Sequence, residues 1–117
     1  MTVKEFYDSI GVSPDEVIKR FGGSETMLTK FLNKFLADTT FNQLEEAVAA
    51  GDNETTFRAA HTLKGLAGNF DFVKLRDLSA SIVERYRAND FAPIPEIFGQ
   101  LKVCYNETVE SLKKLFA

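Results

Sequence analysis

Apolar residues recur along most of the chain with a spacing near 3.6 residues, which is the period of an α-helix. No window of more than a few residues alternates polar and apolar positions as a half-buried strand does. The pattern therefore predicts an all-α fold.

Two helices are predicted in the first half of the chain. Ser13-Pro14-Asp15-Glu16 is a helix-start signal, and the helix it begins should run to about Phe21. After Gly22-Gly23, Ser24 can cap a long second helix that ends at Gly51. The β-branched pair Thr39-Thr40 interrupts the apolar stripe of this helix, so we expect a bend there. Before the bend the stripe consists of Leu28, Phe31, Leu32, Phe35 and Leu36.

Three further helices are predicted in the second half. Asp52 or Asn53 can cap the first of them, which should continue to about Phe70. The next lies between Asp71 and Asn89-Asp90, and two prolines then make residues 91–95 the longest predicted loop. The last begins at about Pro95 and carries an apolar stripe of Ile97, Leu101, Cys104, Thr108, Leu112 and Leu115.

Four substantial helices with short connections predict an antiparallel four-helix bundle with one or two short N-terminal capping helices. At 117 residues the chain falls within the size range of a single domain. We therefore expect one domain over residues 1–117, with cap helices in residues 1–23 and the bundle in residues 24–117.

Composition narrows the environment and the partners. Fourteen Lys and Arg against 17 Asp and Glu give a net charge of −3, with both signs scattered, so nothing recruits nucleic acid or an anionic membrane. No apolar run resembles a signal peptide or reaches the roughly 20 residues of a membrane span. Cys104 cannot form an internal disulfide and should be inert packing, and a single His beside it leaves too few ligands for a zinc site. We expect a cytoplasmic monomer without a metal.

The predicted helix around the only histidine has two distinct faces. One face is an apolar stripe that must point to the core, made of Thr56, Ala60, Leu63, Ala67 and Phe70. The other, whose centre lies roughly 145° away, is made of Phe57, His61, Lys64, Gly65 and Gly68. His61 should therefore point outward, where its imidazole is accessible as a nucleophile.

The neighbours of His61 suit phosphoryl transfer. Lys64 lies one helical turn away and can reach an anion held on the imidazole. Gly65 and Gly68 each destabilise a helix by about 1 kcal/mol relative to alanine, and their benefit is clearance for a partner's backbone or a phosphoryl group. Phe57 is either a core residue at the flank or part of a docking patch.

The segment Ala60-His61-Thr62-Leu63-Lys64-Gly65, with a further Gly68, resembles the signature of histidine phosphotransfer (HPt) domains. The likeness extends over about residues 24–84. Two positions depart from the family pattern. A glycine is common where this chain has Asp71, and a polar side chain that holds the second imidazole nitrogen is common where it has Val83. Ser79, Glu84 or a water could take the role of that polar side chain.

The resemblance implies a phosphorelay protein in which His61 carries a phosphoryl group covalently. A receiver-domain aspartyl phosphate, or a kinase, donates the group, and a response regulator's aspartate takes it. Partners would be receiver domains and hybrid histidine kinases, and the receiver would supply the magnesium ion, so the chain would need no cofactor. It would not be an enzyme with its own ATP site, and neither a Walker A motif nor a kinase glycine loop occurs.

Three other interpretations compete with this one. A helical adaptor could bind receiver or kinase domains without accepting phosphate. Gly65-Leu66-Ala67-Gly68 could be mistaken for the GxxG loop of an RNA-binding KH domain, but that fold contains strands, which this sequence does not predict. A histidine-nucleophile hydrolase is disfavoured because no orienting carboxylate is identifiable near His61.

Overall fold

The computed structural model describes residues 1–117 and contains seven α-helices and no strands, which confirms the all-α prediction. In chain order the helices are α1 (Val3–Ser9), α2 (Pro14–Arg20), α3 (Glu25–Ala37), α4 (Thr40–Ala50), α5 (Asn53–Asn69), α6 (Val73–Arg87) and α7 (Ile94–Leu115). None of them is both long and apolar enough to cross a membrane.

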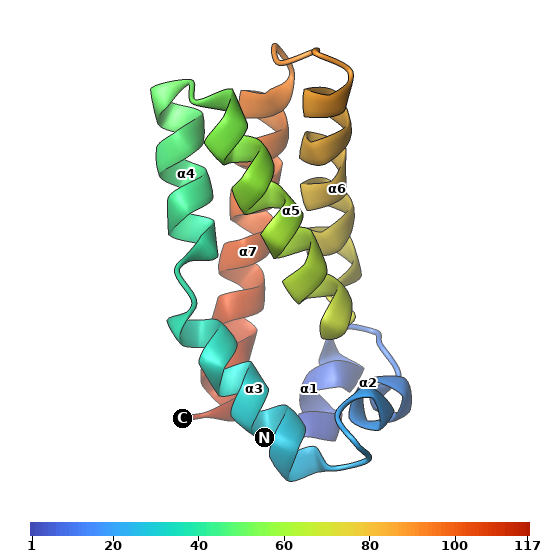
Figure 1. Ribbon diagram of the computed structural model, residues 1–117. Coiled ribbons are helices and arrows are strands. Elements are labelled where there is room, and N and C mark those ends of the chain that lie inside the picture. Colours follow the sequence, from blue (N-terminus) through green and yellow to red (C-terminus); the bar gives the residue numbers. More distant parts are fainter.

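Helices α4 to α7 lie side by side along the long axis of the molecule (Figure 1). Helix α5 packs against α4 and α6, and α7 packs against α6 and α4, so each of the four contacts two others. Helices α1, α2 and α3 lie together at the end of the molecule where both chain termini are found. The longest connection, between α6 and α7, covers residues 88–93 and thus begins and ends a little earlier than predicted.

The expected single bent helix over residues 24–51 is instead two helices. Helix α3 ends at Ala37 and α4 begins at Thr40. Asp38 has extended backbone angles, and its Oδ1 accepts a hydrogen bond of 2.8 Å from the backbone N–H of Thr40. Because this carboxylate satisfies a donor at the start of α4, the chain can begin a new helix in a new direction.

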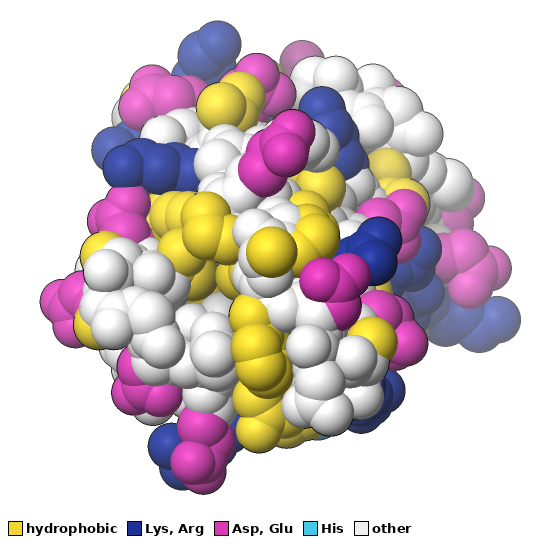
Figure 2. Space-filling model, turned by 90° about the horizontal axis from the view of Figure 1, so that it is seen from above, with side chains coloured by type: hydrophobic (Ala, Val, Ile, Leu, Met, Phe, Trp, Pro, Cys, Tyr) yellow, Lys and Arg dark blue, Asp and Glu magenta, His cyan; other side chains and the backbone are white.

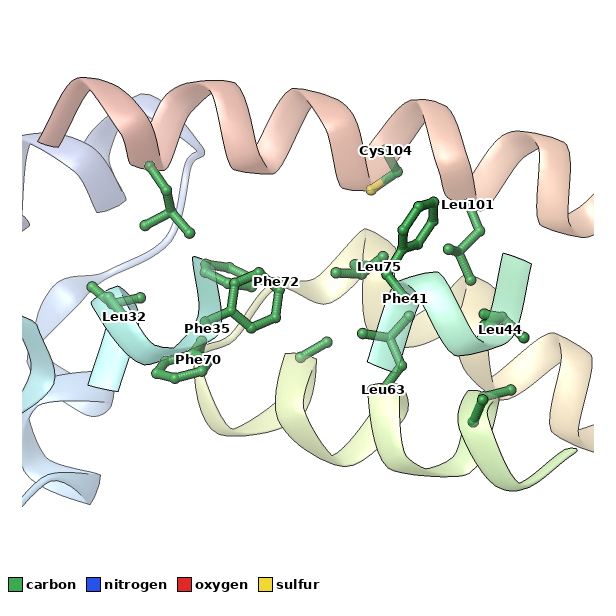
Figure 3. Close-up of a cluster of buried hydrophobic side chains, with 14 of the residues drawn as sticks. Leu32, Phe35, Phe41, Leu44, Leu63, Phe70, Phe72, Leu75, Leu101 and Cys104 are labelled. Atoms are coloured by element: carbon green, nitrogen blue, oxygen red, sulfur yellow. The ribbon is translucent and has the colours of Figure 1, made fainter. Parts of the chain in front are cut away.

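The core is one cluster of 23 buried residues that extends through the whole molecule. Figure 3 shows side chains of this cluster, among them Phe35, Phe70 and Phe72, which meet where α3 approaches the end of α5. The predicted inward stripe of α5 is confirmed, since none of its members is more than 4% exposed: Thr56, Ala60, Leu63, Ala67 and Phe70. Phe31, which the sequence placed on the inward stripe of α3, is 37% exposed.

Both N-terminal helices contribute aromatic side chains to this core. Phe6 and Tyr7 of α1 pack against Phe72, and Phe21, at the end of α2, stacks on Phe70 with ring centroids 5.6 Å apart. The N-terminal segment is therefore part of the packed domain. The far end of the molecule, seen from above in Figure 2, shows hydrophobic side chains bordered by charged ones of both signs.

Candidate functional site

His61 lies near the middle of α5 on its exposed face. The Asp52 side chain caps this helix by accepting a 3.1 Å hydrogen bond from the backbone N–H of Thr55. The residues around the histidine fix its direction, because Ala60 is fully buried and Leu63 is 1% exposed. The helix therefore holds the imidazole outward on a rigid, well-packed element.

Phe57 lies one turn before His61, and their ring centroids are 6.0 Å apart at an angle of 37°. The Phe57 ring is half-buried against the core and stacks on Tyr86 of α6, with centroids 4.4 Å apart. The guanidinium carbon of Arg87 lies 5.8 Å from the centroid of the same ring. Phe57 therefore packs against the core and also borders the surface beside the imidazole. Its position is compatible with both roles considered for it, that of a core residue and that of a docking residue.

Lys64 lies one turn after His61 and is half-buried. Other lysines make ion pairs, as Lys102 does with Glu45 at 2.6 Å, but Lys64 pairs with no carboxylate. Its ammonium is therefore available to an anion on the same face of the helix.

The two glycines of the exposed face have different surroundings. A Cβ atom added at Gly65 would meet nothing within 4 Å, so the backbone there is open. A Cβ atom added at Gly68 would lie 3.6 Å from the Cδ of Arg76 on α6, which is ordinary van der Waals contact. The clearance expected from both glycines is found at Gly65, whereas Gly68 has the Arg76 side chain alongside.

The end of α5 explains why the chain tolerates Asp71 where the family often has glycine. Asp71 has φ 55°, in the left-handed region where glycine is favoured and Asp is among the better-tolerated alternatives. The next amide, that of Phe72, donates a 2.9 Å hydrogen bond back to the carbonyl of Ala67. Arg20 of α2 stabilises this turn, because its Nη1 lies 2.9 Å from Oδ1 of Asp71 and also donates to the carbonyl of Gly68.

None of the side chains considered for the second imidazole nitrogen bonds to it. Val83 is apolar and fully buried. The Ser79 hydroxyl, also fully buried, donates a 2.8 Å hydrogen bond to the carbonyl of Leu75. Glu84 lies 3.4 Å from Arg87 in an exposed ion pair. The contact that the structure does give the imidazole is with the ring of Phe57.

Sequence reasoning did not find three residues that shape this site. They are Tyr86 and Arg87 of α6 and Arg20 of α2. An aromatic residue followed by a cation at the end of α6 is a feature of the sequence that could have pointed to Tyr86 and Arg87. Arg20 had no such feature, because its partners on α5 and beyond lie 48 to 51 positions away in sequence.

Comparison with known families decides the relationship. The family model described as Hpt domain matches residues 27–111, which include His61, Lys64 and both glycines of the exposed face. The chain belongs to the Hpt domain family. Hpt domains are phosphotransfer carriers rather than enzymes with their own ATP site, and they interact with the receivers and kinases of two-component phosphorelays. Comparison with curated proteins and with solved structures gave no match.

No group of three or more His, Cys, Asp or Glu side chains could hold a metal ion anywhere in the chain. Beside His61 lie instead the Lys64 ammonium, which pairs with no carboxylate, and the open backbone at Gly65. Such a face can receive a phosphoryl group and stabilise its charge.

Proposed function

We propose that this Hpt domain accepts a phosphoryl group on His61 from the aspartyl phosphate of a receiver domain, or from a kinase, and passes it to the aspartate of a response regulator. The observation that carries the proposal is the placement of His61. It is the only histidine of the chain, it lies exposed within the matched family region, and the unpaired Lys64 lies one turn away.

The transfer needs little from this chain beyond a nucleophile and its surroundings. A lone pair on the neutral imidazole attacks the phosphorus, the N–P bond forms, and the bond from phosphorus to the aspartate oxygen breaks. The receiver's carboxylate leaves with the electron pair. Passing the group on reverses these steps toward a second aspartate. The receiver would supply the magnesium ion expected to assist both steps.

Two neighbours of His61 support this chemistry. The bound phosphoryl group places negative charge beside the helix, and the Lys64 ammonium can offset it by a charge-assisted contact. The open backbone at Gly65 leaves room for the receiver's active-site loops to approach the imidazole. The function also needs a rigid platform, and we propose that α4 to α7 form the antiparallel bundle that supplies it, as their mutual contacts and short connections favour.

The proposal is tested by incubating the chain with each purified, phosphorylated receiver domain of the source organism. We expect a subset of receivers to transfer acid-labile phosphate to the chain, and His61→Gln to abolish labelling while leaving helix content unchanged. Labelling of His61→Gln would overturn the proposal. A chain that binds receivers equally well with or without His61, and is never labelled, would instead be a helical adaptor.

A further inference from the structure

Phosphoryl transfer from His61 needs a defined ring orientation, and no side chain hydrogen-bonds to the imidazole to set it. Phosphoryl transfer requires the attacking nitrogen to be aligned with the bond that breaks, and misalignment slows the reaction steeply. The position from which a polar side chain would be expected carries Val83, which is fully buried. The nearest polar candidates on the same helix make other hydrogen bonds or ion pairs. Another feature must therefore restrict the imidazole.

The Phe57 ring is placed to do so. It lies one turn before His61 on the same face, with ring centroids 6.0 Å apart and an angle of 37° between the planes. Aromatic pairs attract one another at centroid separations of about 4.5–7 Å, and offset or edge arrangements are preferred. The flat side of one ring also blocks part of the rotation of the other.

The Phe57 ring is itself fixed from α6. Tyr86 stacks on it with centroids 4.4 Å apart and planes 23° from parallel, and the Arg87 guanidinium carbon lies 5.8 Å from its centroid. Its packing against the core adds a further restraint. Contacts with several partners restrict the rotation of a side chain, so Phe57 can transmit a defined geometry to its neighbour.

We propose that Phe57, held by Tyr86, is the positioning residue for the His61 imidazole and takes the place of the polar partner absent at Val83. This inference rests on the proposed function, since orientation matters only if His61 is the nucleophile. It predicts that α6 acts on the histidine through aromatic packing. The role differs from docking, because a docking residue changes how tightly a receiver binds and a positioning residue changes how fast the bound pair reacts.

The test compares four variants of the full chain. Phe57→Leu removes the ring but keeps apolar bulk, Tyr86→Leu removes the stacking partner without touching His61, and Phe57→Tyr restores a ring. Phe31→Leu is the matched control. It deletes an aromatic ring on α3 that is 37% exposed and that pairs with Phe21 rather than with Phe57, His61 or Tyr86. Circular dichroism and thermal unfolding establish which variants fold.

Two readouts are measured on each variant. The first is the order parameter of the His61 ring C–H bonds by NMR relaxation, which requires no receiver. The second is phosphotransfer from a receiver that labels the unaltered chain, with the maximal rate and the half-saturating receiver concentration obtained separately. We expect Phe57→Leu to lower the ring order parameter and to reduce the maximal rate about two- to tenfold, the range given by the strength of an aromatic pair. The half-saturating concentration should stay within twofold.

Tyr86→Leu should show the same changes to a smaller degree, Phe57→Tyr should behave as the unaltered chain, and Phe31→Leu should change neither readout. An unchanged ring order parameter in Phe57→Leu would overturn the proposal, as would a loss confined to the half-saturating concentration. If no receiver labels the unaltered chain, the proposed function fails, and the order parameters still decide whether Phe57 restrains the imidazole. If Phe57→Leu does not fold, the comparison of Tyr86→Leu with Phe57→Tyr gives the same decision.

Discussion

Replacing Gly65 by alanine should separate stability from function in this chain. Gly65 lies inside α5 with ordinary helical backbone angles, and an added Cβ would meet nothing within 4 Å. Glycine in a helix interior is about 1 kcal/mol less favourable than alanine, because more backbone freedom is lost on folding. Gly65→Ala should therefore raise the free energy of unfolding by about 1 kcal/mol, which corresponds to about 4 °C in the melting temperature.

The same methyl group should impair phosphotransfer. It would project from the His61 face toward any partner that approaches the imidazole closely. A displacement of about 1 Å between reacting groups can slow a reaction by roughly 100-fold. We therefore expect Gly65→Ala to reduce the maximal rate of transfer by one to two orders of magnitude while the protein becomes more stable.

Gly99→Ala provides the matched control. Gly99 lies inside α7, is exposed, and also has nothing within 4 Å of its added Cβ, but it is on a different helix from His61. It should give the same stabilisation, measured by thermal and urea unfolding, with unchanged transfer. Equal transfer rates in Gly65→Ala and the unaltered chain would refute the clearance argument. A lower melting temperature would refute the assignment of Gly65 to an unstrained helical position.

Three further changes test separate parts of the structure. Lys64→Ala should slow transfer roughly 10- to 100-fold through loss of a charge-assisted contact, with helix content unchanged by circular dichroism; an equal rate would exclude the role assigned to Lys64. Tyr7→Phe should raise the free energy of unfolding by about 1 kcal/mol at neutral pH, because the buried Tyr7 hydroxyl has no hydrogen-bond partner. Burial also raises the pKa of this phenol above its usual value of 10.0, so above about pH 10 the unfolded chain releases the phenol proton before the folded chain does, and the free energy of unfolding falls as the pH rises further. Urea titrations should show a shallower alkaline loss in Tyr7→Phe. Arg20→Ala should lower the free energy of unfolding by about 1 kcal/mol, since its contacts at the end of α5 are partly exposed, and an unchanged urea midpoint would count against them.

Local rules predicted much of this fold. The period of apolar residues identified the inward face of α5, and the start signal at Ser13-Pro14 placed α2 within a residue of its observed end. The first helix is predicted only as one of the caps, without bounds, although Thr2 and Glu5 form a complete capping box that is visible in the sequence. The two threonines at positions 39 and 40 predict only a bend, whereas the break between α3 and α4 depends on the carboxylate of Asp38 before them.

The candidate site was predicted only in part, because helical periodicity specifies neighbours within one helix but not contacts between helices. Residues spaced three or four apart on one helix are neighbours whatever surrounds them, so Phe57, His61 and Lys64 could be placed on one face from the sequence alone. The contact between Phe57 and Tyr86 depends on how α5 and α6 are aligned, which helical periodicity does not specify. The same applies to Arg76 beside Gly68. Pairings between helices require the three-dimensional packing.

The attachment of α2 to the end of α5 bears on where this domain can be cut. The family match begins at residue 27, after both N-terminal helices. A fragment that began there would lose the Arg20 contacts to the last turn of α5 and would expose Phe70 and Phe72, which Phe21, Phe6 and Tyr7 now cover. The boundary of recognisable family sequence and the boundary of the folding unit therefore differ by more than twenty residues in this chain. Expression of the domain should follow the second boundary.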